Sequence, residues 1–184
     1  ARHNLAVLYE SLGDADLAAA ELAAQLSLAP WKRSAFLALA EFHRRQGEAD
    51  DAVAVYLQLT TRFPGFSEGF ERLGRTYQQL GRTEAAASAF LQALKLEAGR
   101  VRTHLLLARL YKSARRIADM VAACRNLLAV DPHNREAHTL LAYGYRQMGQ
   151  LQPAARHAQA ALATAPADSL QAQWQHWLRQ TARY

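Results

Sequence analysis

The order of apolar and polar positions along the chain repeats every 34 residues. The clearest series is a leucine that returns without a break, at Leu5, Leu39, Leu73, Leu107 and Leu141. A ring follows each leucine four positions later, at Tyr9, His43, Tyr77, Tyr111 and Tyr145. Residues four apart lie on one face of an α-helix. The spacing therefore predicts five helices that each bury the same stripe.

Two further series predict a turn and a second helix in every repeat. Glycine returns at Gly13, Gly47, Gly81 and Gly149, with Arg115 at the skipped position. Glycine commonly stands where a helix ends in a left-handed turn. Small residues return at Ala18, Ala52, Ala86 and Ala154, with Met120 as the exception, and we expect two helices to approach closely there. Proline, which ends the second helix, returns at Pro30, Pro64, Pro132 and Pro166, with Ala98 filling the gap.

Five series that agree on one period resemble the tetratricopeptide-repeat family over the whole chain. The expected units are a truncated first repeat at 1–32, followed by 33–66, 67–100, 101–134 and 135–168. The resemblance implies an all-α fold, a right-handed superhelical solenoid of antiparallel helix pairs. The physics agrees, because a single pair cannot bury its apolar face alone and must stack on its neighbours.

Two parts of the chain depart from the regular repeat. Residues 169–184 are expected to form a C-terminal capping helix and tail, with an apolar stripe of Leu170, Trp174, Trp177 and Leu178. In the fourth unit Arg115, Met120 and Cys124 replace the usual glycine, alanine and aromatic residue. We expect a looser or slightly rotated helix pair there.

The composition indicates a globular chain with an excess of positive charge. The 184 residues are 51% hydrophobic and 21% charged, with a formal net charge of +6 that comes mostly from arginine. This suggests an anionic partner, but a general bias toward arginine and alanine is the favoured explanation. There is no apolar run of membrane-spanning length and no signal-peptide pattern. The first residues read as the middle of a helix, so we expect a fragment whose targeting signal, and hence compartment, lies outside it.

The residues that could carry chemistry fall into the structural series. His43 stands in the ring series, and His104 and His138 share the position of Phe36 and Phe70. We therefore expect these histidines to pack rather than to bind metal. Cys124 shares the position of Tyr56 and Phe90 and has no positioned base nearby in sequence. With no phosphate loop, nucleophile elbow or paired carboxylates, we expect no catalytic residues, no metal site and no cofactor.

In the family, the first helix of each pair lines a concave groove that binds peptides. Carried over by position, the resemblance implies a groove lined by Leu37, Glu41, Arg72, Arg75, Arg102, Leu105, Leu106, Arg109, Lys112, Leu140, Tyr143 and Arg146. The family's clamp for a terminal carboxylate is not expected here, because Leu37 and Glu41 stand where its first lysine and asparagine would be. The family's asparagine ladder is also not expected, because only Asn4 fits it.

The leading hypothesis is a non-catalytic scaffold that binds a protein segment with acidic and apolar residues. Arginines would take the carboxylates and leucines the apolar side chains. The alternative for this surface is a solvated face in which Glu68–Arg72 and Glu71–Arg75, four residues apart, satisfy each other. Alternatives for the whole protein are self-assembly through open repeat ends, or a recognition module of a larger enzyme. RNA binding ranks last, because the groove carries one aromatic residue, Tyr143.

Overall fold

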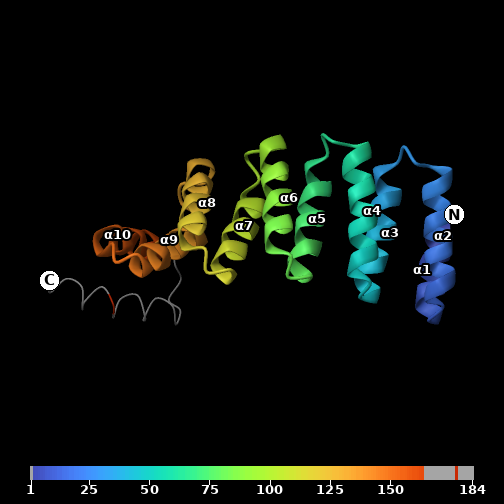
Figure 1. Cartoon of the computed structure of the whole chain (residues 1–184), viewed down its shortest axis with the longest axis horizontal. Coiled ribbons are helices and arrows are strands. Elements are labelled where there is room, and N and C mark those ends of the chain that lie inside the picture. Colours follow the sequence, from blue (N-terminus) through green and yellow to red (C-terminus); the bar gives the residue numbers. More distant parts are fainter. Residues whose placement is uncertain (1, 164–176, 178–184) are drawn as a thin grey trace. The chain divides into compact units, whose positions relative to one another are not determined.

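The computed structural model describes residues 2–163 and Trp177, and the described part is built from α-helices (Figure 1). In this described part, ten helices follow one another as five consecutive pairs joined by short turns. They are α1 (Arg2–Leu12), α2 (Ala15–Leu28), α3 (Arg33–Gln46), α4 (Ala49–Arg62), α5 (Ser67–Gln79), α6 (Thr83–Leu96), α7 (Val101–Ser113), α8 (Ile117–Val130), α9 (Arg135–Gln147) and α10 (Leu151–Ala163). The all-α solenoid fold expected from the sequence is confirmed.

The chain divides into two compact units, Ala1–Glu97 and Ala98–Tyr184. Unit 1 contains α1 to α6 and unit 2 contains α7 to α10. The residue limits of the five repeats stay a prediction.

The turn inside each helix pair uses a residue with left-handed backbone geometry. The four glycines of the series have φ between 69° and 86°, and Arg115 takes the same region with φ of 58°. The backbone hydrogen bond that closes the turn is also kept, because Arg116 N donates to Tyr111 O at 2.9 Å just as Arg82 N donates to Tyr77 O. The fourth pair therefore turns like the others, and the loosening that we expected is not present at its turn.

Small residues mark the closest packing of the helices. Ala18, Ala52, Ala86 and Ala154 are all fully buried, as expected from their series. Met120, the exception, is also fully buried. The space for it comes from Gly144 on α9, where an added Cβ would lie 2.6 Å from Val121 Cγ2 and 2.8 Å from Met120 Cε. The larger side chain of Met120 on α8 thus fits because Gly144 on α9 has no side chain, and the interior stays close-packed.

Two expectations concern the end of the chain and the membrane. The predicted capping helix at 169–184 lies outside the described residues except for Trp177, which is half-buried and packs, like Leu162, against Ala142 and Ala158. Among the described helices, none combines the length and the apolar character that crossing a membrane requires.

Candidate functional site

Unit 1 contains a cleft of about 320 Å³ that lies mainly between the first helices of its pairs. Its apolar lining comes from Ala6, Val7, Leu22, Leu37 and Ala38. Its polar lining comes from His3, Glu10, Ser34, Glu41, Arg45 and Arg72. On α3, Leu37, Glu41 and Arg45 follow one another at intervals of four, which places them along one helix face. Leu37, Glu41 and Arg72 of the predicted groove therefore line one cleft.

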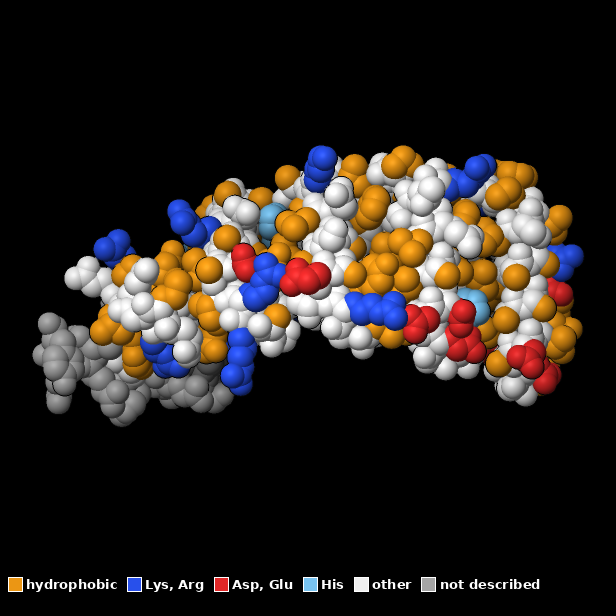
Figure 2. Space-filling model, in the orientation of Figure 1, with side chains coloured by type: hydrophobic (Ala, Val, Ile, Leu, Met, Phe, Trp, Pro, Cys, Tyr) orange, Lys and Arg blue, Asp and Glu red, His pale blue; other side chains and the backbone are white. Residues whose placement is uncertain are grey.

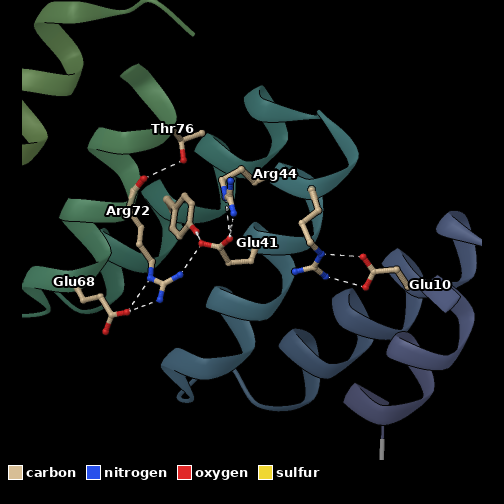
Figure 3. A network of polar contacts seen from close by, with 8 residues as sticks. Glu10, Glu41, Arg44, Glu68, Arg72 and Thr76 are labelled. Carbon is tan, nitrogen blue, oxygen red and sulfur yellow. Dashed lines mark hydrogen bonds and ion pairs between the residues drawn. The ribbon is translucent and has the colours of Figure 1, made fainter. Parts of the chain in front are cut away.

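The charged edge of the cleft is held by ion pairs between neighbouring first helices. Arg45 on α3 donates two hydrogen bonds to Glu10 on α1, each 2.9 Å long (Figure 3). A two-point contact of this kind fixes the plane of the guanidinium group as well as its position. The pair is largely exposed, so its contribution to stability is small. Its effect is to hold both side chains in place beside the apolar lining.

Glu41 is the centre of the polar network drawn in Figure 3. One carboxylate oxygen accepts hydrogen bonds from the Tyr56 hydroxyl at 2.8 Å and from Arg72 Nη1 at 2.6 Å. The other accepts from Arg44 Nε at 2.8 Å. Partial burial tends to raise the pKa of this carboxyl, but the bonds from Tyr56, Arg44 and Arg72 outweigh it and leave the pKa below its usual value. Glu41 is therefore ionised at neutral pH and tied to three partners.

Arg72 on α5 is occupied by two carboxylates at once. Glu68, one helical turn before it, accepts from Nε at 2.8 Å and from Nη2 at 2.6 Å, and Glu41 accepts from Nη1. Burial lowers the pKa of Arg72, but the bonds to Glu68 and Glu41 overcome this effect and raise it. The Glu68–Arg72 pairing considered from the sequence is thus present. A ligand carboxylate would have to compete with two resident ones at this arginine.

A small basic pocket adjoins the cleft and shares Glu41 and Arg72 with it. Its lining is completed by Arg44, Arg75 and Gln79, so three arginines stand against one glutamate. Arg75 is exposed and makes no ion pair with any described residue, whereas Glu71 is buried with 4% of its surface exposed. The Glu71–Arg75 pairing considered from the sequence is therefore not present. Among the pocket's arginines, Arg75 is the one available to an incoming anion.

The remaining predicted groove residues lie in unit 2, on α7 and α9. Arg109 donates two hydrogen bonds to Glu136, at 2.5 Å and 2.6 Å. These bonds hold the pKa of Arg109 above its usual value. Lys112 Nζ lies 5.1 Å from the centre of the Tyr143 ring. Leu105 and Leu106 are half-buried, and Arg102 and Arg146 are exposed. Leu140 is only 4% exposed and offers little surface to a ligand.

The contacts between neighbouring first helices were not found by sequence reasoning. Glu10 and Arg45 are 35 residues apart, Glu41 and Arg72 are 31 apart, and Arg109 and Glu136 are 27 apart. The first two separations are close to the 34-residue period, and the third is about two helical turns shorter. Opposite charges spaced by roughly one repeat were therefore the available signal. On the face drawn in Figure 2, several basic side chains likewise border acidic ones. Hydrophobic side chains fill the surface between these charged groups.

Residues that could carry other chemistry have structural contacts. Cys124 is fully buried, and burial together with the charge of Glu136 raises its pKa to about 12. His43 Nδ1 lies 2.7 Å from Glu48 Oε2, and Asp51 lies close enough to complete a three-ligand group. This group was not anticipated from the sequence. It sits on exposed or half-exposed side chains, and the pair with Glu48 already satisfies the imidazole nitrogen.

Comparison with known proteins adds a family and a set of similar structures. Tetratricopeptide-repeat family models match residues 1–30 and 68–99, and residues 33–76. No match was found among curated proteins.

Among solved structures, one of MamA is 18% identical over 88% of each chain, with a TM-score of 0.73. YrrB, described as a TPR protein with an unusual peptide-binding site, is 15% identical over 92% of this chain and 87% of its own, with a TM-score of 0.70. TTC0263, a thermophilic TPR protein in Thermus thermophilus, is 24% identical over 95% of this chain and 96% of its own, with a TM-score of 0.56. At these identities the similarity concerns the fold.

Proposed function

Since the chain belongs to the tetratricopeptide-repeat family, we propose that it is a non-catalytic scaffold that binds a segment of another protein in the cleft of unit 1. The observation that carries this proposal is the cleft itself, where an apolar lining lies next to a basic pocket. Proteins of this family are generally scaffolds without catalytic activity. The description of YrrB as a TPR protein with an unusual peptide-binding site is in keeping with this use of the fold.

The cleft favours a segment that carries an apolar side chain. Its volume of about 320 Å³ lies at the lower end of the range for ligand sites, roughly 300–1,000 Å³. This space suits one or two side chains rather than a folded domain. Val7 is 51% exposed and lies in the lining, so apolar surface is available for contact without any rearrangement. Burying a leucine or phenylalanine there would contribute about 1.5–3 kcal/mol before the costs of association.

The basic pocket favours an acidic residue next to that apolar one. Arg72 is held by Glu41 and Glu68, so the new partner for a carboxylate is Arg75. Because the network fixes Glu41, Arg44 and Arg72 before binding, little side-chain entropy is left to lose there. We therefore expect the bound segment to place a carboxylate beside its apolar anchor.

The experiment is selection from a displayed library of random peptides on the immobilised protein. Enriched peptides are expected to carry Asp or Glu beside Leu, Ile, Phe or Met. Arg75→Glu should weaken their binding about tenfold or more, because a charge-assisted bond is replaced by repulsion. Val7→Asp should weaken it through the apolar lining. Arg75 and Val7 are preferred to Arg72, whose loss would also release Glu41 and Glu68.

The matched control is Arg125→Glu, which makes the same charge change at an exposed site on α8. It should leave peptide binding unchanged. Enrichment of no peptide class, or equal loss for Arg75→Glu and Arg125→Glu, would rule out this site.

Self-assembly has a specific observation in its favour as a second candidate. Leu5 on α1 is 37% exposed, whereas Leu39 and Leu73 at the equivalent positions are 7% and 4% exposed. Leu8 and Leu12 on the same helix are 52% and 66% exposed. Sedimentation velocity over a hundredfold concentration range tests this, and Leu8→Glu should abolish any association. A constant sedimentation coefficient would exclude self-assembly through α1 over that range.

A further inference from the structure

Two histidines face each other between α9 and α10 in unit 2. His138 Nδ1 on α9 lies 2.9 Å from His157 Nδ1 on α10, and the ring centres are 5.2 Å apart. Both side chains are half-buried. The equivalents of His157 in the second, third and fourth pairs are Val55, Ala89 and Ala123, all of them buried. A polar contact thus replaces an apolar position of the repeat.

The other ring nitrogen of His138 determines where the protons lie. His138 Nε2 is 3.0 Å from the carbonyl oxygen of Pro132. Since a carbonyl oxygen only accepts, Nε2 carries the proton, and Nδ1 of neutral His138 must then accept. His157 Nδ1 is therefore the donor of the bond between the rings. His104 makes the same anchoring bond to Ala98 O at 2.9 Å, but Ala123 stands at the position equivalent to His157.

The pair can accommodate one additional proton but not two. A single extra proton lets His138 Nδ1 donate to His157 Nδ1, while the proton of His157 moves to its other nitrogen. A second proton places two N–H groups and two positive charges against each other at 2.9 Å. The hydrogen bond between the helices must then break.

The surroundings oppose full protonation. The groups that act on His157 are His138 from α9 and Arg156 from α10 itself, and Tyr145 from α9 stacks on its ring at 5.6 Å. Burial first, followed by the positive charges of His138 and Arg156, lowers the pKa of His157. The same positive charge disfavours a bound metal cation. Next to this contact, α9 and α10 pack through the small residues Ala142 and Ala158, with Leu162 and Trp177 against them.

We propose that His138 and His157 form an acid-sensitive latch between α9 and α10. The latch holds while the two rings share at most one extra proton, and it releases α10 from α9 when both are charged. The folded state favours the neutral form of His157, because its pKa is lowered there. The stabilisation is therefore fully present above the ordinary histidine pKa of about 6.5, and it is lost as the pH falls through the lowered value in the fold.

The test is hydrogen exchange of the whole chain at about pH 7.5, 6.5 and 5.5, corrected for the intrinsic exchange rate. The opening equilibrium constant of the α10 amides should rise by up to about tenfold between pH 6.5 and pH 5.5. The reason is that taking up one proton on opening changes this constant by at most about tenfold for each pH unit. The amides of α4, in unit 1, should not follow this dependence. Equal protection of α10 at all three pH values would overturn the latch.

Two variants taken from the chain's own repeats separate the latch from simple packing. His157→Ala installs the residue found at Ala89 and Ala123, and His138→Phe installs the one found at Phe36 and Phe70. His157→Ala should make the protection of α10 nearly independent of pH, and His138→Phe should reduce the dependence to the part that the burial of His157 causes. The control, His104→Phe, removes a histidine with the same anchor and should keep the dependence. Variants that keep the full tenfold change would contradict the proposal.

Ring titration by nuclear magnetic resonance decides the case if His157→Ala alone leaves α10 unprotected at every pH. In the wild type, the pKa of His157 should lie below the ordinary histidine value, because burial and the neighbouring ring of His138 oppose its protonation. In His138→Phe, His157 should titrate in a single step. Titration of His157 at the ordinary value in the wild type would overturn the proposal.

Discussion

Replacing Gly74 with alanine tests how the repeat tolerates exceptions. At the equivalent positions the chain has Ala6, Ala40, Ala108 and Ala142, all buried. Gly74 differs because of its neighbour on α6. An added Cβ would lie 2.7 Å from both Cδ1 and Cε1 of Phe90, whose ring is fully buried. The ring cannot move away without disturbing the core of unit 1.

Two opposing terms set the size of the effect. Overpacking a filled core costs about 1–3 kcal/mol, while replacing glycine with alanine inside a helix contributes about 1 kcal/mol of stability. We therefore expect Gly74→Ala to destabilise the protein by about 1 kcal/mol. In a Phe90→Leu background the ring is absent, so the same substitution should instead stabilise it by about 1 kcal/mol. Leucine is the natural choice, since Leu22 holds this position in the first pair.

The assay is urea unfolding of the four proteins of the double-mutant cycle, followed by far-ultraviolet circular dichroism and by tryptophan fluorescence. The expected coupling energy is about 2 kcal/mol, with a change of sign for Gly74→Ala between the two backgrounds. Phe90→Leu alone should cost about 1–2 kcal/mol. If Gly74→Ala has the same effect with and without the ring, the proposed steric cause is wrong.

Two other predictions concern single residues of the fourth pair. Arg115→Gly should stabilise the protein by about 0.5–1 kcal/mol, because Arg115 has φ of 58° and only glycine takes this region without cost. Urea unfolding measures the change in stability, with Gly81→Arg as the reverse substitution. A loss of stability on Arg115→Gly would contradict the prediction. The Cys124 thiol, whose pKa burial raises to about 12, should react with a maleimide at neutral pH at a rate set by unfolding, so that urea accelerates labelling. Rapid labelling of the folded protein would show that the thiol is accessible.

The sequence alone determined the elements and their order. The signals in the sequence each concern about one helical turn or one tight contact. They are the leucine and ring series, the turn glycines and the alanine series. Local rules of helix geometry therefore suffice to read them. Even the exception at Arg115 follows the rule, because the turn is closed by backbone hydrogen bonds that do not depend on the side chain. The compensation of Met120 by Gly144 was not predicted, since it joins two helices of different repeats.

Only the tertiary structure decided which charged side chains form ion pairs with each other. The sequence offered Glu68–Arg72 and Glu71–Arg75 as equal candidates at the same spacing. The first is formed, and in the second Glu71 is buried while Arg75 remains exposed. Arg72 also reaches Glu41 on the neighbouring first helix, 31 residues earlier. The partner of a long charged side chain is chosen by the faces that meet in space, and the local period of one helix does not contain that information.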